Sequence, residues 1–451
     1  MFEALLVATA LVAVIGLLAA LDGSRDVFHP LVFIAPMLVF LYSWMPYKLW
    51  FAGGLDRYFD TNQLLFVQRI NIFGVLAFVG ACLWVGVRLP ANRVVSTPPL
   101  TQEACRRLLV GACIAGMVGL ICWGVTIINV GGFTAAYSTS YTGGWDDSGY
   151  VRDGTLQLLV AVLLAITSLA AGGPRIPAIW IMALFGFPWL SQALLMARRG
   201  PTFAFVVVVL MGWYTTRRKR PPVFAVGGLG IALGWLVLFL VTNRGSIYLG
   251  SDFDVKTDVS GIVNTADTGN EYIYGSGTIL ASIRRNHYFW MRRYLAQILV
   301  RPIPSSVWPT KYEDFGVPEL RVNAGTGEGF ADALGWVGAP GSAPGIIADL
   351  WVEVSWLSIA LMALLGWAYG VVWKKAVLKG GPWSTQYVLL AALSIYLVMQ
   401  TMEAVIFRVI ELSIPCWIVW RWALKPPPVP ESRAIRESRL PLPSERGYEH
   451  V

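Results

Sequence analysis

Long apolar runs separated by short polar segments make up most of this chain. A helix needs roughly 17–25 mostly apolar residues to cross the hydrocarbon core of a bilayer, and about eleven runs approach that length. The pattern therefore predicts an all-α polytopic membrane protein with about eleven transmembrane helices. These helices are expected at Phe2–Leu21, Leu31–Leu49, Ile70–Val87, Leu108–Val130, Leu156–Ala171, Ala178–Leu195, Phe203–Tyr214, Val223–Val241, Leu350–Trp373, Tyr387–Met402 and Val405–Leu424.

The same pattern divides the chain into four parts. Residues 1–243 hold the first eight predicted spans, and residues 350–424 hold the last three. Between them, residues 244–349 form one large polar loop, within which apolar residues recur at helical spacing over Ser276–Arg301 and predict an amphipathic helix resting on the bundle. Residues 425–451 are rich in proline and charge, which predicts a disordered tail.

Basic residues predict which loops face the cytoplasm. The loops between spans three and four, seven and eight, and nine and ten are rich in Lys and Arg, as is the tail, and alternating spans place all of them on one side. Short basic loops are usually cytoplasmic. We therefore expect a multi-pass protein of the cytoplasmic (inner) membrane, with a cytoplasmic tail. The loop 244–349 and the turn Arg198–Arg199 would then face the periplasmic or extracellular side.

Composition agrees with this class of protein. The chain is 56% hydrophobic and 14% charged, whereas soluble domains are about half apolar and about a quarter charged. Loop positions account for much of the net charge of +8, so we expect no nucleic-acid partner. None of the five cysteines lies in the loop 244–349 and none pair at metal-ligand spacing, so we expect neither a disulfide framework nor a zinc site.

Several energy-coupling signatures are absent from the sequence. It shows no phosphate-binding loop, no dinucleotide fingerprint and no ladder of acidic residues within the predicted spans. We therefore expect no cofactor, and neither ATP nor an ion gradient as the energy source. An activated substrate would supply the energy instead, and a lipid-linked diphosphate is the natural one for a site in a membrane.

Arginines concentrate on the predicted outer side, against their usual preference for the cytoplasm. Arg198-Arg199-Gly200-Pro201 joins spans six and seven, where a guanidinium pair and the free N–H groups of a first helical turn both suit phosphate. For any one arginine the alternative is a side chain that reaches to lipid head groups. We predict that an anionic diphosphate binds to Arg198, Arg199, Arg244, Arg285 and Arg292.

Three outward-facing residues are candidate general bases, namely Glu328, Asp349 and His287. Histidine titrates near neutrality, although helical counting places His287 on the apolar stripe of its predicted helix and favours a packed side chain. Either carboxylate could instead cap a helix or pair with an arginine. Asp252-Phe-Asp254 has the spacing of a carboxylate pair that holds a divalent metal on a nucleotide sugar, but it lies in an acidic loop, and we predict no metal site.

Three stretches resemble the O-antigen polymerase (Wzy-type, oligosaccharide repeat unit polymerase) family. Arg198-Arg199-Gly200 resembles its serine/alanine-Arg-Gly step. Residues 301–311 (Arg-Pro-Ile-Pro-Ser-Ser-Val-Trp-Pro-Thr-Lys) resemble its Pro-Arg-x-x-Trp-Pro-x-Lys-Pro segment, with Ser305 where the family has arginine. Residues 343–351 (Ala-Pro-Gly-Ile-Ile-Ala-Asp-Leu-Trp) resemble its small-Pro-x-x-x-x-Glu-x-Tyr helix, with Asp349 in place of glutamate.

The resemblance implies a metal-independent glycosyltransferase with the multi-span class C fold and a catalytic external loop. Such enzymes join oligosaccharide repeat units carried on undecaprenyl diphosphate, which serves as donor and acceptor. Arginines would stabilise the departing diphosphate, Arg301 and Lys311 would bind substrate, and a base would take the acceptor proton. A chain-length regulator or a flippase would be a partner. The alternatives are an O-antigen ligase-like enzyme with another acceptor, and a non-enzymatic lipid-linked oligosaccharide flippase or transporter with arginines lining a cavity among its spans.

Overall fold

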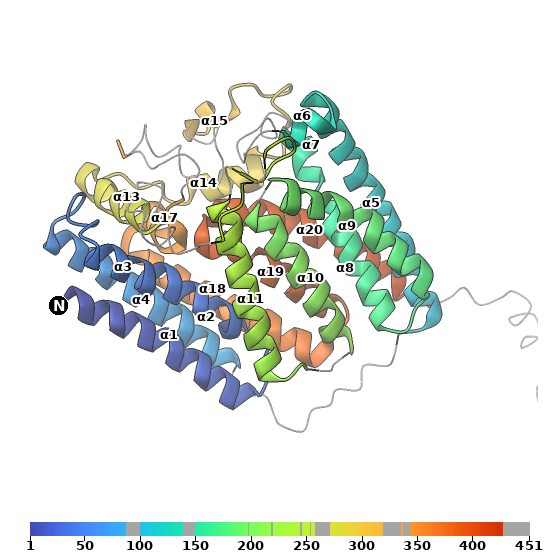
Figure 1. Cartoon of the computed structure of the whole chain (residues 1–451), viewed down its shortest axis with the longest axis horizontal. Helices are drawn as coiled ribbons and strands as arrows, with labels where there is room; N and C mark the ends of the chain where they lie inside the picture. The colour runs from blue at the N-terminus through green and yellow to red at the C-terminus, as the bar shows by residue number, and fades with distance from the viewer. Residues whose placement is uncertain are drawn as a thin grey trace, which may run out of the picture.

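The computed structural model describes residues 1–86, 100–138, 149–196, 198–217, 220–243, 246–252, 254–257, 271–318, 335–336 and 343–426. All the regular elements within these ranges are helices. Figure 1 shows long helices packed side by side, with the shorter ones gathered along one end of the bundle. The prediction of an all-helical protein is therefore confirmed for the described part of the chain.

The first helices form a layer with the C-terminal part of the chain. α1 and α4 pack along each other, and α4 also lies along the full length of α18. α2 starts where Pro30 occupies the first helical position and the Nδ1 atom of His29 accepts a hydrogen bond from the Leu31 N–H, 3.2 Å away. The elements are α1 (Phe2–Ser24), α2 (Pro30–Val39), the π-helical turn η1 (Phe40–Trp44), α3 (Met45–Phe51) and α4 (Thr61–Gly86).

The middle of the chain contains both the most buried and the most exposed of the long helices. Almost every side chain of α8 is buried, because α5, α9, α10 and α20 surround it. α11 lies outside the bundle, with only 6% of its apolar span buried. The elements are α5 (Gln102–Asn129), α6 (Phe133–Tyr137), α7 (Gly149–Gly154), α8 (Gln157–Ala170), α9 (Arg175–Met196), α10 (Arg199–Arg217) and α11 (Val223–Thr242).

The last part of the chain returns to the bundle after the polar loop. α17 is buried along its whole length, against α13, α18, α19 and α20. The elements are α13 (Glu271–Arg285), α14 (Arg292–Leu295), the π-helical turn η3 (Ala296–Val300), α15 (Lys311–Asp314), α17 (Gly345–Val354), the 3-10 turn η5 (Ser355–Leu357), α18 (Ser358–Lys379), α19 (Pro382–Met399) and α20 (Met402–Ala423).

Nine helical segments in the described ranges are long and apolar enough to cross a membrane. Two further helices, α10 and α20, occupy the positions of the seventh and eleventh predicted spans, and α20 carries several charged residues. A multi-pass membrane protein is therefore supported by the length and composition of the helices. The total number of spans and the side that each loop faces stay predictions.

The predicted amphipathic helix Ser276–Arg301 is wrong as one continuous element. α13 ends at Arg285, and Asn286, Trp290 and Met291 have positive φ angles of 49°, 52° and 66° before α14 begins. The turn is held because the Phe289 and Trp290 N–H groups donate to the last carbonyls of α17, on Val352 and Glu353, at 3.0 and 2.8 Å. Those carbonyls have no partner within their own helix, so an outside donor stabilises the break.

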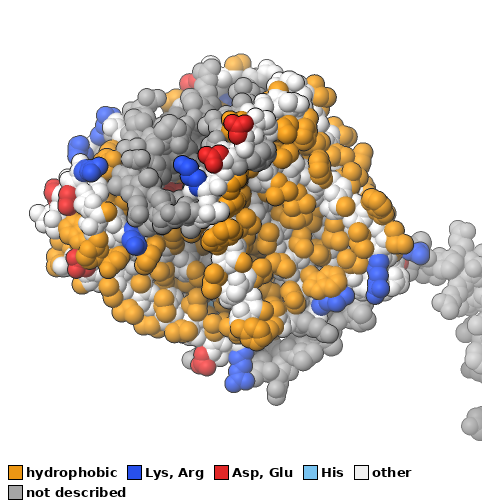
Figure 2. Space-filling model, in the orientation of Figure 1, with side chains coloured by type: hydrophobic (Ala, Val, Ile, Leu, Met, Phe, Trp, Pro, Cys, Tyr) orange, Lys and Arg blue, Asp and Glu red, His pale blue; other side chains and the backbone are white. Residues whose placement is uncertain are grey.

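The loops divide between two ends of the bundle. We call the end that holds α6, α7, α13, α14 and α15 the outer end, and the opposite end, where the α1–α2 and α10–α11 connections meet, the inner end (Figure 1). Figure 2 shows a broad apolar face with charged side chains mainly towards these two ends. This distribution is what a bilayer around the middle of the bundle would require.

Candidate functional site

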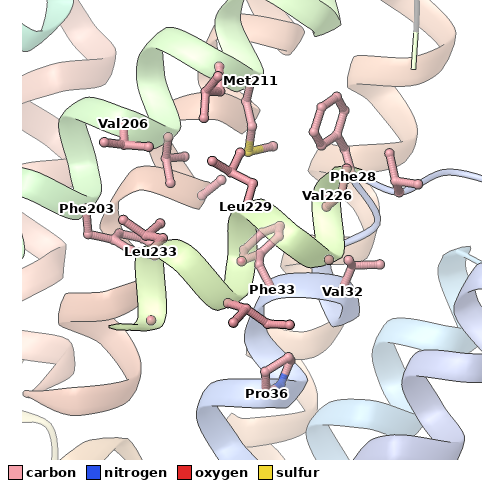
Figure 3. Close-up of a pocket in the computed structure, with 18 of the residues that line it drawn as sticks. Phe28, Val32, Phe33, Pro36, Phe203, Val206, Met211, Val226, Leu229 and Leu233 are labelled. Carbon is pink, nitrogen blue, oxygen red and sulfur yellow. The ribbon is translucent and has the colours of Figure 1, made fainter. Parts of the chain in front are cut away.

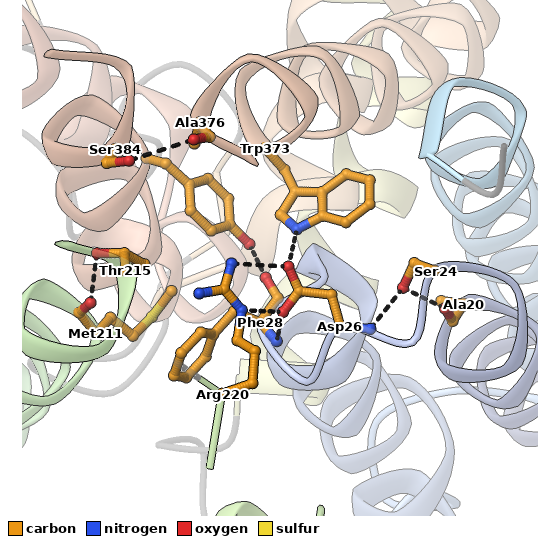
Figure 4. A network of polar contacts seen from close by, with 11 residues as sticks. Ala20, Ser24, Asp26, Phe28, Met211, Thr215, Arg220, Trp373, Ala376 and Ser384 are labelled. Atoms are coloured by element: carbon orange, nitrogen blue, oxygen red, sulfur yellow. Dashed lines mark hydrogen bonds and ion pairs between the residues drawn. The ribbon is translucent and has the colours of Figure 1, made fainter. Parts of the chain in front are cut away.

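An ion pair between Asp26 and Arg220 lies at the inner end (Figure 4). The two oxygens of Asp26 accept from Nε and an Nη atom of Arg220 at 2.7 and 3.1 Å, and also from the Phe28 N–H at 2.9 Å and the Trp373 indole at 3.1 Å. Tyr387 donates from its hydroxyl to the Phe28 carbonyl. This Asp26 network joins α1, α18, α19 and the α10–α11 connection, and the full set of donors to the Asp26 carboxylate indicates a structural role.

A second ionic contact lies at the outer end and is almost fully buried. One Nη atom of Arg293 lies 3.1 Å from Asp349 and 3.1 Å from Glu353, and the other lies 2.5 Å from Glu403. None of these four side chains is more than 2% exposed. We call them the Arg293 cluster. One guanidinium therefore faces three carboxyl groups that are shielded from bulk solvent.

Three elements bring the Arg293 cluster together. Asp349 and Glu353 are four residues apart on α17 and so share one face of that helix. Glu403 lies in the first turn of α20, where the helix dipole favours a carboxylate. Arg293 comes from α14, just after the turn that docks onto the end of α17. Burial lowers the pKa of Arg293, but the adjacent carboxylates raise it well above its usual value, so it stays protonated.

A second group of charges surrounds Arg301, at the end of η3. Arg301 is ion-paired with Asp153 of α7, and its guanidinium stacks 4.4 Å from the ring of Phe407. Arg408 of α20 lies close enough to Arg152, Asp153 and Arg301 to interact electrostatically with each. Glu411, one turn further along α20, completes the group. We call Arg152, Asp153, Arg301, Arg408 and Glu411 the outer arginine cluster.

Gln297 connects the two clusters. Its amide nitrogen donates to Glu403 at 3.0 Å, and its amide oxygen accepts from Arg301 at 2.8 Å. A continuous set of polar contacts therefore runs from α17 through α14, η3 and α20 to α7. The Arg293 cluster and the outer arginine cluster therefore belong to one hydrogen-bonded network.

The start of α10 approaches the outer arginine cluster through a glycine. A Cβ atom at Gly200 would collide with the hydroxyl of Tyr396 on α19, so only glycine permits this close approach. The guanidinium of Arg408 lies 4.5 Å from the ring of the same tyrosine. The predicted Arg198-Arg199-Gly200 step and the outer arginine cluster therefore meet at Tyr396.

An apolar groove runs along the bundle between α11 and the helices α2, α10 and α19. Its volume is about 720 Å³, and its lining is almost entirely hydrophobic, as Figure 3 shows for Phe33, Phe203 and Leu233. Phe203 follows Gly200 by less than one helical turn, and Met399 follows Tyr396 in the same way. The outer end of the apolar groove therefore lies next to the outer arginine cluster.

Two of the predicted bases have surroundings that differ from those expected. Asp349 is buried, and in addition to Arg293 it accepts hydrogen bonds from the Tyr294 hydroxyl at 2.6 Å and the Met402 N–H at 2.8 Å. Asp349 therefore matches the alternative in which the carboxylate pairs with an arginine. The expectation of a packed His287 is wrong, because the residue is exposed between α13 and α14, with its ring 5.0 Å from that of Phe289.

The side chain of Lys311 is buried and is not open to solvent. Its side chain is 1% exposed, and Nζ donates to the carbonyls of Val300, Arg301 and Ile303 at 3.4, 3.3 and 2.5 Å. These carbonyls follow the end of η3, where a cation is favoured by the helix dipole. Lys311 therefore holds the end of the element that positions Arg301, and substrate contact by Lys311 stays a prediction.

The Trp308–Lys311 stretch folds into a compact turn around one carboxylate. The Trp308 indole and the Thr310 hydroxyl both donate to Asp314, at 2.6 and 2.8 Å. These two hydrogen bonds lower the pKa of Asp314. The segment that resembles the family motif thus forms a local structure of its own at the outer end.

The predicted diphosphate-binding arginines lie against different segments. Arg285 packs on Gly335, Arg292 lies near Gly316, and the half-buried Arg198 lies within electrostatic range of Tyr137. Burial raises the pKa of Tyr137, and Arg198 partly opposes that rise. Glu328, Arg244 and the side chain of Arg199 lie outside the described residues, as does the tail from residue 427.

Four acidic residues lie in or beside the ninth and eleventh predicted spans, while the absence of an acidic ladder for ion coupling stays a prediction. Asp349 and Glu353 are four residues apart on α17, and Glu403 and Glu411 are eight residues apart on α20, which also carries Arg408 and Arg421. The predicted site residues did not include Arg293 or Arg408. The signal that could have found Arg408 is a charge inside an apolar run, where an ionisable residue is by default a functional candidate. Arg293 lies in the polar loop 244–349, where that signal does not apply.

Among the residues that the structure describes, no three His, Cys, Asp or Glu side chains are placed to hold a metal ion together. Asp252 and Asp254 are both exposed. The absence of a metal site stays a prediction.

Comparison with known proteins does not identify the chain. No family model matches it, and neither a curated protein nor a solved structure matches it. The resemblance to the O-antigen polymerase family therefore rests on the three stretches described above.

Proposed function

We propose that this protein is a membrane glycosyltransferase that joins oligosaccharide repeat units carried on undecaprenyl diphosphate, as an O-antigen polymerase does. The observation that carries the proposal is that the apolar groove ends beside the outer arginine cluster. A lipid diphosphate has a long apolar chain joined to a doubly charged anion, and these two features complement that arrangement in shape and charge.

The apolar groove is assigned to the isoprenoid chain of the substrate. Its lining offers almost no hydrogen-bonding groups, so only a hydrocarbon gains free energy by entering it. The volume of about 720 Å³ lies within the range of ordinary ligand sites. Because α11 makes few contacts with the bundle, a lipid could reach the groove from the surrounding bilayer between α11 and α2.

The outer arginine cluster is assigned to the diphosphate. An acceptor hydroxyl attacks the anomeric carbon of the donor glycan, the bond from that carbon to the diphosphate oxygen breaks, and the hydroxyl proton passes to a base. Negative charge develops on the departing diphosphate, where Arg408 and Arg152 would stabilise it. Glu328 and His287 stay candidate bases, whereas Asp349 is buried beneath Arg293.

A flippase or transporter is the second candidate, and one observation favours it. Arg408 and Glu411 lie within α20 among the long helices, as a pathway for a charged lipid head group through the bundle would require. An O-antigen ligase-like enzyme would share the proposed site and differ in its acceptor. Product analysis separates all three.

The test uses the purified full-length protein with a defined undecaprenyl-diphosphate oligosaccharide, followed by sizing of the products. We expect a ladder of lengthened chains. One addition to a foreign acceptor would favour the ligase, and movement of the lipid between leaflets without any product would favour the transporter. A chelator should leave the ladder unchanged, because the proposed chemistry uses no metal.

Arg408→Gln tests the role of the outer arginine cluster. Loss of one charged donor to a developing anion costs roughly a hundredfold to a thousandfold in rate, so the ladder should nearly disappear while the protein stays folded. The matched control is Arg217→Gln at the inner end, where the guanidinium stacks on Trp213 at 3.7 Å, far along α10 from Gly200. Equal activity in the two variants would remove Arg408 from the mechanism.

A further inference from the structure

The Arg293 cluster contains more negative groups than its single positive group can balance. If Asp349, Glu353 and Glu403 were all ionised, two uncompensated negative charges would remain in side chains that are at most 2% exposed. Isolated charges without water or a counter-ion are very costly to bury, and such groups normally become neutral instead. One of the three carboxyl groups is therefore the site where a proton is bound.

The hydrogen bonds identify which carboxyl group this is. Both oxygens of Asp349 accept hydrogen bonds, from Arg293 on one side and from Tyr294 and the Met402 N–H on the other. Both oxygens of Glu403 also accept, from Arg293 and Gln297. Such full donation stabilises the ionised form of these two carboxylates.

Glu353 differs from the other two. Its Oε1 atom accepts from Arg293 at 3.1 Å and the Met291 N–H also approaches the carboxyl group, whereas its Oε2 atom is buried and has no hydrogen-bond partner among the described residues. A buried oxygen without a donor is far less costly on a neutral carboxylic acid than on a carboxylate. The charged and titratable groups that face it are Arg293 and Tyr294 from α14, Asp349 from its own helix and Glu403 from α20.

A metal ion is the less suitable occupant. The guanidinium of Arg293 already occupies the space that the three carboxyl groups share, and no group of three ligands in the described ranges is placed around a metal. Tyr294 donates its hydroxyl hydrogen to Asp349 and so stays neutral. A proton needs no additional volume and removes one of the two excess charges.

We propose that Glu353 binds a proton at neutral pH, which makes the Arg293 cluster a buried proton-binding site at the outer end. The proton comes from water and adds to Oε2 of the carboxylate, and no other bond is formed or broken. Because Glu403, Gln297 and Arg301 connect the cluster to Asp153, gain or loss of this proton changes the electric field at the outer arginine cluster. The proposal does not depend on the glycosyltransferase assignment.

Infrared spectroscopy of the purified full-length protein at pH 7 tests the proposal. A buried protonated carboxylic acid has its own carbonyl stretching band, separate from those of carboxylates and amides. We expect this band in the wild-type protein, a shift when glutamate is labelled with carbon-13, and no shift when aspartate is labelled. Glu353→Gln should lose the part of the band that Glu353 contributes, whereas Glu411→Gln, whose Oε2 is also buried without a hydrogen-bond partner, should retain that part. Glu403→Gln and Asp349→Asn each remove one negative charge from the cluster and should weaken it.

Thermal unfolding of the same variants gives an independent measurement. A glutamine resembles a protonated glutamate in shape and charge, so Glu353→Gln should keep the thermal midpoint of the wild type. Glu403→Gln and Asp349→Asn remove ionised partners of Arg293 and should lower it clearly. The proposal is overturned by a band of unchanged intensity in Glu353→Gln, by its absence from the wild type, by its loss only in Glu411→Gln, or by a Glu353→Gln variant that fails to fold.

Discussion

An arginine–carboxylate contact closes each end of this bundle, but the two contacts differ in their balance of charge. At the inner end, Arg220 faces one carboxylate, Asp26, and every oxygen of that carboxylate accepts hydrogen bonds. At the outer end, Arg293 faces three carboxyl groups. A balanced pair needs no further partner, whereas an unbalanced one requires a proton or another positive charge.

The arginines at the two ends also differ in their exposure to solvent. The Arg220 side chain is 27% exposed, so water still solvates part of its charge. The Arg293 side chain is 1% exposed, and its charge is compensated only by protein groups. The inner contact therefore behaves as a structural ion pair, while the outer one is sensitive to any change in charge. The outer contact also adjoins the proposed substrate site.

The largest effect is expected for Arg293→Met. This change leaves three buried carboxyl groups without their guanidinium, and the loss of one partner from a buried ion pair costs roughly 3–5 kcal/mol of folding free energy. The thermal midpoint in detergent should fall accordingly. Adding Glu403→Gln and Asp349→Asn to the variant should recover part of the loss. An unchanged midpoint in Arg293→Met would show that the cluster contributes nothing to stability.

A smaller effect is expected for Asp26→Asn at the inner end. The amide keeps the shape of the side chain but removes the charge that faces Arg220, and it places an NH₂ group among donors. Because Arg220 is partly solvated, the expected cost is about 1–3 kcal/mol, measured as a shift in the same thermal midpoint. A loss as large as that of Arg293→Met would contradict the distinction drawn between the two ends.

The smallest effect concerns the pH dependence of the inner end. His29 lies just before the candidate span Pro30–Phe51, and burial lowers its pKa from 6.5 to about 4, with Asp26 partly opposing that shift. The unfolded chain therefore binds a proton before the folded chain does. The neutral His29 side chain stabilises the folded protein fully above pH 6.5, and this contribution is lost as the pH falls towards 4.

His29→Asn isolates this contribution. Asparagine still accepts from the Leu31 N–H at the start of α2 but does not titrate. Between pH 7 and pH 6 the wild-type protein should lose about 0.7 kcal/mol that the variant keeps, as measured by thermal unfolding at several pH values. Identical pH profiles for the two proteins would assign the dependence to other groups.

The long helices were predictable, but their ends were not. The predicted span Ile70–Val87 corresponds to α4, which begins at Thr61 because polar residues in its first half find buried partners. Gln68 donates to Thr9 and to the Tyr42 carbonyl, both at 2.9 Å, so a hydropathy pattern that excludes it misses two turns of helix. The break at Asn286–Met291 was missed for a related reason, since its hydrogen-bond acceptors lie on α17.

The candidate site was predictable only in its general location. The concentration of arginines in and around the loop 244–349 drew attention to the segment that includes Arg301, although the role and the sidedness of this segment are still predictions. The sequence did not indicate that Arg293 rather than Arg292 would be buried, because neighbouring residues of a short helix differ only in the direction of their side chains. That direction depends on where α17 and α20 lie.

What the amino-acid sequence determined by itself is the set of apolar helices, because the length of each apolar run depends only on neighbouring residues. The tertiary structure alone decided which charges meet. Arg293 is paired with carboxylates 56 and 110 positions away in the chain, and Arg301 with one 148 positions away. Electrostatic energy depends on distance in space and on the exclusion of water, and neither is encoded in the local pattern of residues.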